Sequence, residues 1–338
     1  MSKKAFEIQF NWIFVLVAGA IILLFFTLIV VKQKSVSETS TKATILKGIE
    51  AIIIGASVTQ DTTKIENIPS ANIEIGCGRV SIDGVSKQYQ NLILFAPGLL
   101  KGDKLAWQTT AFSAPYRATN LLYMTSPNVR YIIIGNNNLV KEINKSLPFD
   151  LKVEFYQNYQ NIQIKDLNNY KVRFIVFGDM IDFPQELKRM PDFDVTAINI
   201  NPNAQKGAIN FYEKKENSWT LKGTSSYIGQ SSIVGAVYTD TLETYHCNMQ
   251  NAFLRLALVT RIQTDRLEKL KNIISSRNNC AEIYSAALPL LKSISSFSSK
   301  LAESSKLEIS DINSLADASK KLSDINKEAQ KYSCTLIY

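Results

Sequence analysis

The feature that most constrains this chain is an uncharged, almost wholly apolar run near its amino terminus, residues 8–31. Between Trp12 and Val31 only Gly19 and a threonine interrupt the apolar side chains. At about 1.5 Å of rise per residue, a helix over this run spans roughly 36 Å and crosses a hydrocarbon core of roughly 30 Å with some tilt. Trp12 lies near one end, where its indole N–H can reach headgroup water. The sequence therefore predicts a transmembrane helix over 8–31, preceded by a short tail over 1–7.

Two kinds of cleaved segment are alternatives to this anchor. Ala18-Gly19-Ala20 has the small residues of a signal-peptide cleavage site, but it lies in the middle of the apolar run, where a signal peptide's apolar region should already end. Lys3-Lys4-Ala5-Phe6 resembles the basic approach to a pilin-type cleavage site, but Phe10 stands where a pilin usually has glutamate. We therefore interpret the run as an uncleaved anchor.

Charge near the run leaves its orientation open, because Lys3 and Lys4 on one side balance Lys32 and Lys34 on the other. Cysteine usage favours one orientation, since all four cysteines follow the run and disulfides persist outside the cytosol. We expect a cell-membrane protein with a cytoplasmic amino terminus and an extracytoplasmic chain from about residue 35 onward. The alternative is four free thiols in a reducing compartment.

The segment 32–70 is expected to contain a linker and a helix. Residues 35–44 (SVSETSTKAT) read as a polar spacer, and the isoleucines that follow recur at helical spacing, which predicts a helix over about 40–57. Residues 73–82 alternate well enough to predict a strand that contains Cys77.

Residues 71–246 are expected to form an α/β domain. Short apolar runs predict strands buried on both faces, as in a mostly parallel sheet. They lie at 92–95, 131–134, 153–155, 174–177 and 195–200. Apolar residues at helical spacing in 137–146 place a helix between two of these runs, which makes a βαβ unit. The predicted fold is a mostly parallel α/β sandwich.

An antiparallel extension of this domain is expected over residues 207–240. Two alternating segments flank a turn at Glu216-Asn217, which is typical of a hairpin. The apolar residues 233–238 predict a third strand.

Residues 247–338 are expected to form a helical bundle of three helices. The second and third helices should make a hairpin that turns at residues 304–308. The third helix carries apolar residues at three-four spacing, a seam for a neighbouring helix. The seam is too short to favour an intermolecular coiled coil over a bundle within the chain.

The helical hairpin predicts how the cysteines pair. Cys280 and Cys334 are equally distant from its turn along the sequence, so both sulfurs should reach its open end within bridging distance. Cys247 begins the first helix and lies about 45 Å of helix away from Cys280, which leaves Cys77 as its partner. The sequence predicts the disulfides Cys77–Cys247 and Cys280–Cys334.

No catalytic or cofactor-binding signature stands out, and we expect no cofactor. The single histidine, His246, excludes sites that need two imidazoles. His246 and Cys247 are adjacent, and adjacent residues on a helix point about 100° apart, too far for a catalytic pair. Residues 76–81 (GCGRVS) begin like a dinucleotide fingerprint but lack its last glycine.

Three other features are candidates for function. Asp179 and Asp182 follow a predicted strand, where ligands of open α/β sheets bind, and are candidate metal ligands unless they belong to a solvated loop. The aromatic-rich segment 107–123 is interpreted as core in preference to a recognition surface. Asn144 begins an Asn-Lys-Ser glycosylation acceptor, which matters only outside the cytosol.

The formal net charge of +8 does not indicate nucleic-acid binding. Nucleic-acid surfaces need clustered basic residues, and here the basic residues are spread out, with pairs such as Lys214-Lys215 as the largest groups. The expected partners are the lipid bilayer and a protein, either a different one or further copies of this chain.

Three segments carry a resemblance to a known family. Residues 6–16 (FEIQFNWIFVL), 245–249 (YHCNM) and 333–338 (SCTLIY) resemble single-pass membrane-anchored proteins of small-genome archaea. That family has no assigned activity, so the resemblance implies an anchored architecture and a cell-surface location, and it transfers no catalytic residue.

The sequence favours a non-catalytic, membrane-anchored binding or assembly module of the cell envelope. One alternative is a membrane-tethered enzyme with its site at the carboxyl edge of the sheet near Asp179. Another is a subunit of a surface filament or envelope complex.

Overall fold

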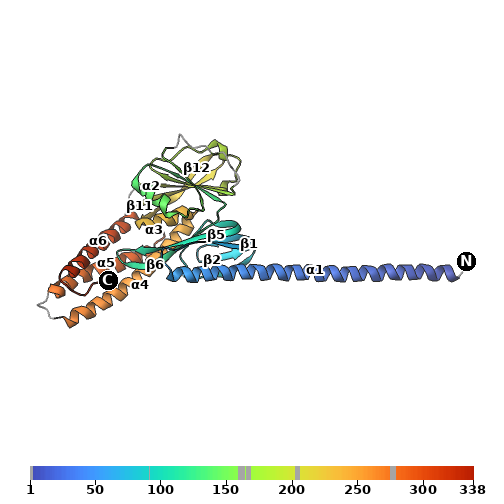
Figure 1. The fold of residues 1–338 in the computed structure, drawn as a ribbon, viewed down its shortest axis with the longest axis horizontal. Coiled ribbons are helices and arrows are strands. Elements are labelled where there is room, and N and C mark those ends of the chain that lie inside the picture. Colours follow the sequence, from blue (N-terminus) through green and yellow to red (C-terminus); the bar gives the residue numbers. More distant parts are fainter. Residues whose placement is uncertain (1–2, 91, 159–163, 165–168, 202–205, 275–278) are drawn as a thin grey trace.

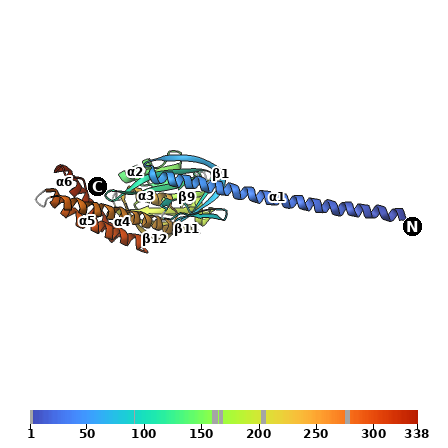
Figure 2. The same cartoon turned by 90° about the horizontal axis from the view of Figure 1, so that it is seen from below.

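A single long helix leaves a folded body in the computed structural model, which describes residues 3–90, 92–158, 164, 169–201, 206–274 and 279–338 (Figure 1). Helix α1 is Lys3–Val58 and runs without a break from the amino terminus into the body. The body lies at the carboxyl end of α1 in both Figure 1 and Figure 2, and the rest of the helix extends away from it. Within α1, Leu16–Lys34 is long and apolar enough to cross a membrane, and none of it is buried.

The expected polar spacer 35–44 is part of α1, which corrects the prediction of a linker. The segment contains neither glycine nor proline, so nothing in it interrupts the hydrogen bonds of the helix. Its hydroxyl groups also bond within the helix, because Thr44 Oγ1 donates to the carbonyl oxygen of Ser40 at 2.9 Å. Among the side chains of α1 that the structure describes, the first buried one is Ile45, directly after this segment.

Sheet A is the six-stranded sheet against which α1 packs. Its order is β3-β2-β1-β5-β6-β4, antiparallel except for the β4–β6 pair. Its strands are β1 (Thr63–Gly76), β2 (Arg79–Ile82), β3 (Val85–Gln88), β4 (Leu94–Phe95), β5 (Leu99–Ser113) and β6 (Arg117–Thr125). The second half of α1 contributes Ile45, Ile49, Ile52 and Ala56 to the apolar core on one face of this sheet.

One sequence prediction is wrong in this sheet. Residues 73–82 form two strands joined by a turn at Cys77 and Gly78, since Gly78 has a φ of +63° that favours glycine. The aromatic-rich segment 107–123 lies in the β5–β6 hairpin, and its interpretation as core is confirmed, because Trp107, Phe112, Tyr116 and Tyr123 are buried. The region 71–246 contains this antiparallel sheet before the mostly parallel one.

Sheet B confirms the α/β prediction for the four apolar runs from 131–134 onward, whereas the run 92–95, also predicted for this sheet, contributes β4 to sheet A. Its order is β12-β11-β10-β9-β7-β8, with β8, β7, β9 and β10 parallel. Its strands are β7 (Val129–Ile134), β8 (Lys152–Tyr156), β9 (Lys171–Phe177), β10 (Val195–Ile200), β11 (Lys206–Lys215) and β12 (Ser218–Ile228). Helix α2 (Asn138–Ser146) connects β7 to β8, so the predicted βαβ unit is present.

The antiparallel extension consists of β11 and β12 alone. Their hairpin turns at Glu216-Asn217, as predicted, and Glu216 adopts a φ of +57° there. Residues 233–238 belong to helix α3 (Gly229–Tyr238) and not to a third strand. Because every residue from Ser232 to Tyr238 is buried, the segment has no polar face, and its sequence pattern cannot distinguish a helix from a strand.

The carboxyl-terminal part contains three long helices, α4 (Leu242–Ile273), α5 (Asn279–Glu303) and α6 (Ile309–Lys331). The turn between α5 and α6 falls at 304–308, as predicted. Helix α4 begins earlier than the predicted residue 247, because the hydroxyl of Thr241 accepts a hydrogen bond from Thr244 N and caps the helix at that point. Two short 3₁₀ helices, Gln185–Leu187 and Asp192–Asp194, precede β10.

A large apolar core joins both sheets to the helices. Phe95, Tyr123, Tyr238 and Tyr245, from sheet A, α3 and α4, are almost completely buried in it. The opposite face of sheet B has a separate core around Phe174. Sheet A thus has α1 on one face and α3 and α4 on the other, an arrangement that Figure 1 shows around β6.

Candidate functional site

A groove of about 610 Å³ lies between the last turns of α1, the first half of β6 and α4. Ile53 and Ala56 of α1 form one wall, and Arg255 of α4 contributes to another. The floor includes residues 117–120 of β6, and Tyr89 and its neighbours lie at the end next to β4. These elements come from distant parts of the sequence, so only the tertiary structure assembles the groove.

The groove lies at the edge of sheet A. Strand β4 pairs with β6 only through Leu94 with Leu122 and Phe95 with Tyr123. Strand β6 continues to Arg117 beyond this pairing, and that part of the strand lies in the groove. Helices α1 and α4 pack on opposite faces of the sheet, so they flank its edge on both sides.

Arg117 is held in the groove by neutral partners. Its Nη2 donates to Asn120 Oδ1 at 2.7 Å. With the Gln60 amide turned so that its oxygen faces the guanidinium, that oxygen accepts from Nη1 at 2.9 Å and from Nε at 3.1 Å. Neither partner is a carboxylate, and three of the five guanidinium N–H groups are used. Arg117 is therefore oriented by these two side chains and has two N–H groups left for a ligand.

Arg255 adds a second positive charge that no carboxylate offsets. Its side chain is exposed on α4, and it has no ion-pair or hydrogen-bond partner among the residues that the structure describes. The described residues that line the groove include no aspartate or glutamate. A cleft lined by charges of one sign concentrates its electrostatic field, so this groove favours anionic groups.

Asn120 fixes the α1 wall relative to the floor. Its Nδ2 donates to the carbonyl oxygens of Ala56 at 3.1 Å and of Thr59 at 2.7 Å. The last carbonyl groups of a helix have no donor within the helix, and a side-chain amide supplies one here. The same residue orients Arg117, so one side chain connects the helix end to the charged end of the groove.

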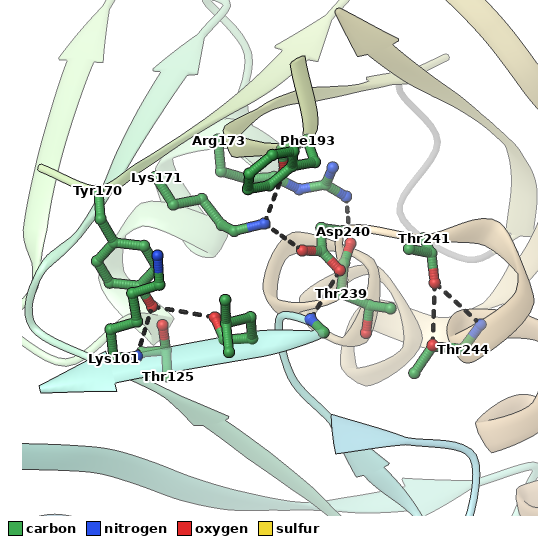
Figure 3. A network of polar contacts seen from close by, with 12 residues as sticks. Lys101, Thr125, Tyr170, Lys171, Arg173, Phe193, Thr239, Asp240, Thr241 and Thr244 are labelled. Carbon is green, nitrogen blue, oxygen red and sulfur yellow. Dashed lines mark hydrogen bonds and ion pairs between the residues drawn. The ribbon is translucent and has the colours of Figure 1, made fainter. Parts of the chain in front are cut away.

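A second polar centre is buried between the two sheets and α3 (Figure 3). Lys171 of β9 lies 2.5 Å from Asp240 Oδ2, and its Nζ also donates to the carbonyl oxygen of Phe193 at 3.1 Å. The other carboxylate oxygen of Asp240 accepts from Gly98 N at 2.9 Å, next to β5 in sheet A. This cluster connects the two sheets to the α3–α4 junction.

Arg173 of β9 completes this centre and caps α3. Its Nη2 donates to the carbonyl oxygens of Ala236, at 2.9 Å, and of Thr239 at the carboxyl end of α3. Burial lowers the pKa of Arg173 to about 10, although the nearby Asp240 carboxylate opposes this shift. Arg173 stays protonated at neutral pH, so its charge stabilises the negative end of the α3 dipole.

Two neighbouring groups have pKa values shifted by burial. Burial raises the pKa of Asp194, and the positive charges of Lys171 and Lys101 partly oppose the shift. Tyr170 has a raised pKa for the same reason, and its hydroxyl donates to Leu99 O and accepts from Lys101 N. The side chains of this centre are buried and bonded to one another and to both sheets. Such contacts fix the position of one sheet relative to the other.

The acidic residues predicted as metal ligands are not brought into a cluster. Asp179 and Asp182 are both exposed in the segment after β9. Among the described residues, no three histidine, cysteine or acidic side chains are placed to hold a metal ion. A metal at Asp179 and Asp182 stays a prediction without further support.

The cysteines pair in the structure as they do in the sequence prediction. Cys77, in the β1–β2 turn, is bonded to Cys247 near the start of α4, with a Cα–Cα distance of 6.0 Å. Cys280 and Cys334 join the start of α5 to the segment after α6, at 5.6 Å. Cys247 is therefore not a free nucleophile beside His246, whose Nε2 is buried without a hydrogen-bond partner among the described groups.

The remaining predicted positions lie outside the groove. Asn144 is half-buried within α2, and the hydroxyl of Ser146 donates to the carbonyl oxygen of Ile143. Gly19 is exposed on α1, and a Cβ added there would meet open space. Trp12 and Val31 lie on α1, but their side chains are outside the described part of the structure.

Sequence reasoning missed Arg117, Asn120 and Arg255 because no local pattern connects β6 to α4. The buried centre left a signal in the sequence, since Lys171 and Arg173 alternate inside an otherwise apolar strand. A charge on both sides of an apolar residue in a buried strand predicts a buried ion pair or a cap.

Comparison with protein-family models, with curated proteins and with solved structures finds no match to this chain.

Proposed function

We propose that this chain is a membrane-anchored extracytoplasmic binding module, held in the membrane by α1 and binding its ligand in the groove at the edge of sheet A. The observation that carries the proposal is the continuity of α1, which enters the core without a break after an unburied apolar stretch. A helix without a linker holds the body at a fixed height and orientation.

The length of α1 gives that height. The apolar stretch ends at Lys34, and Ile45 is the first buried residue among the described side chains of the helix. At about 1.5 Å per residue, the body begins roughly 16 Å beyond the end of the apolar stretch. A rigid spacer of this length suits a module that meets its partner at a defined distance from the bilayer.

Removal of a signal peptide is less compatible with this arrangement. A cut after Ala20 would leave an exposed apolar segment from Ile21 to Val30 on the mature protein. Large exposed apolar surfaces on soluble proteins promote association, so an anchor accounts better for the segment.

The two disulfides support an extracytoplasmic location for the body. Both join segments that are distant in the sequence, 170 positions apart for Cys77–Cys247 and 54 for Cys280–Cys334. Disulfides that brace a fold persist in oxidising compartments. We infer a cytoplasmic amino terminus from this placement.

An assembly role is a second candidate, favoured by the outward face of α1. Ile54 is 63% exposed and Val58 76% exposed, and Ala51 lies on the same face. A surface helix usually carries charged residues opposite the core, and this part of α1 does not. An envelope complex or filament would cover such a face.

Protease treatment of intact cells tests the anchored topology. Carboxyl-terminally tagged full-length protein should lose its tag to added protease, and the intact mass of untreated protein should include the apolar stretch. A shielded tag, or a mature protein that begins after Ala20, would contradict the proposal. Cross-linking in the native membrane with mass spectrometry then distinguishes a single module from an assembly of copies.

A further inference from the structure

We propose that the groove between α1, β6 and α4 binds an acidic segment of a partner protein in an extended conformation. The proposal rests on the binding role proposed above and names the class of ligand for the same groove.

The open edge of sheet A is the first observation. Among the described residues, the outer side of β6 pairs with β4 at Leu122 and Tyr123, and Leu122 N also donates to the carbonyl oxygen of Ile93, just before β4. The floor of the groove begins where this pairing ends and runs to Arg117. Residues 117–119 of β6 lie beyond the bond to Ile93, and an extended peptide placed beside them adds a strand to the sheet.

The charge of the groove is the second observation. Arg117 has two N–H groups left after its bonds to Asn120 and Gln60, and Arg255 has no partner among the described residues. Guanidinium groups bind carboxylates through two parallel hydrogen bonds. Because no described carboxylate of this chain neutralises either arginine, acidic side chains of the peptide supply the missing charge.

The walls of the groove favour an alternating peptide. Ile53 and Ala56 make the α1 wall apolar, whereas Arg255 makes the α4 wall basic. Successive side chains of an extended strand point to opposite sides. A segment of alternating apolar and acidic residues therefore presents its apolar side to Ile53 and Ala56 of α1 and its acidic side to Arg255, and an acidic residue at its end meets Arg117.

The position of the groove argues against lipid headgroups of the anchoring bilayer as the anion. Ile53 follows the end of the apolar stretch at Lys34 by several helical turns. At about 1.5 Å per residue, this places the groove roughly 28 Å beyond that end. The headgroup region does not extend that far beyond the hydrocarbon core.

The test measures peptide binding to the full-length protein in lipid nanodiscs. The probe is a fluorescent hexapeptide of alternating valine and glutamate, and the comparison peptide alternates valine and lysine. We expect binding of the glutamate peptide only, and a loss of about tenfold or more in affinity in Arg255→Glu. Arg261→Glu is the matched control, with the same charge change on α4 outside the groove.

Two further arms decide between strand pairing and simple anion binding. A glutamate hexapeptide with N-methylated backbone amides should bind much more weakly, because it cannot donate to the edge of β6. Inorganic phosphate at the peptide concentration should leave binding unchanged. Equal binding of the N-methylated peptide, displacement by phosphate, or an equal loss in Arg261→Glu would each overturn the proposal.

The result is independent of the topology experiment. If the body is accessible to protease but the peptide does not bind, the proposed ligand class is wrong and the anchored architecture is still supported. Peptide binding with a shielded body contradicts the extracytoplasmic location alone.

Discussion

Lys171 Nζ lies 2.5 Å from Asp240 Oδ2, and both side chains are buried, at 5% and 7% exposure. The pair connects β9 of sheet B to the junction of α3 and α4, and Asp240 also binds the Gly98 amide next to β5 in sheet A. Three parts of the fold therefore depend on one carboxylate. A buried ion pair costs desolvation energy when it forms, so its role here is to fix how the two sheets sit together.

Replacing Lys171 with methionine should destabilise the protein strongly. The change leaves Asp240 buried without its counter-charge, which costs about 3–5 kcal/mol of unfolding free energy. Urea unfolding of the full-length protein in detergent, followed by tryptophan fluorescence, measures this loss.

The matched control is Lys327→Met, which breaks the exposed Lys327–Asp324 pair. Exposed pairs of this kind contribute at most about 1 kcal/mol. Similar losses in the two variants would show that the buried pair does not couple the sheets.

The second half of α1 should unfold together with the body. Ile49 is 1% exposed in the core of sheet A, so Ile49→Ala should lower the unfolding free energy by about 2–5 kcal/mol. Val58→Ala, at a position 76% exposed on the same helix, should change it by no more than about 0.5 kcal/mol. A neutral Ile49→Ala would mean that α1 is not part of the folded body.

Removing the Cys280–Cys334 disulfide should weaken the helical part. The bridge closes a loop between residues 54 positions apart, which stabilises the fold by about 4 kcal/mol when the chain entropy of the unfolded state dominates. The Cys280→Ser, Cys334→Ser double variant should melt at a lower temperature than the wild type. Its melting temperature should equal that of wild-type protein in which only the Cys280–Cys334 disulfide is reduced. Non-reducing peptide mapping checks the pairing, and four free thiols in protein from native membranes would contradict it.

His246 should make the protein less stable in mild acid. Burial lowers its pKa in the folded state below the ordinary value of 6.5. As pH falls below about 6.5, the unfolded chain takes up a proton that the folded chain does not, so stability is lost until the pH falls below the folded-state pKa.

His246→Gln should remove this part of the pH dependence. The unfolding free energy of the variant should fall less steeply than that of the wild type as the pH drops from neutral to mildly acidic values. The chain has one histidine, so no other imidazole titrates in this window. Peptide mapping must show that the neighbouring Cys247 remains bonded to Cys77, and parallel pH profiles would contradict the role of His246.

Several features followed from the sequence because they depend on neighbouring residues. The uncharged run 8–31 predicts an apolar helix that is longer than the core of a soluble protein requires. In the structure this run is part of α1. In the β7–α2–β8 unit and in the β11–β12 hairpin, the hydrophobic pattern of the sequence changes where one element ends and the next begins. The turn at 304–308 also followed from neighbouring residues. Because Cys280 and Cys334 are equally distant from this turn along the sequence, its position predicted that they pair.

Other features depended on what a segment meets after folding. Residues 233–238 have the composition of a strand but form part of α3, and because they are all buried, no polar face marks them as a helix in the sequence. Residues 99–125 contain mixed polar and aromatic side chains without a strand pattern, and they form β5 and β6, which pair with each other and, through β5, with β1.

The sequence by itself determined the apolar span, the parallel strands and the cysteine pairs, because each follows from hydrophobic periodicity or from distance along a helix. Only the tertiary structure decided that sheet A exists, that residues 117–120 of β6 line a groove beyond the pairing with β4, and that Arg117 and Arg255 line the same groove. Those residues come from segments far apart in the chain. Their proximity is set by the packing of α1 and α4 on opposite faces of one sheet, which no local pattern records.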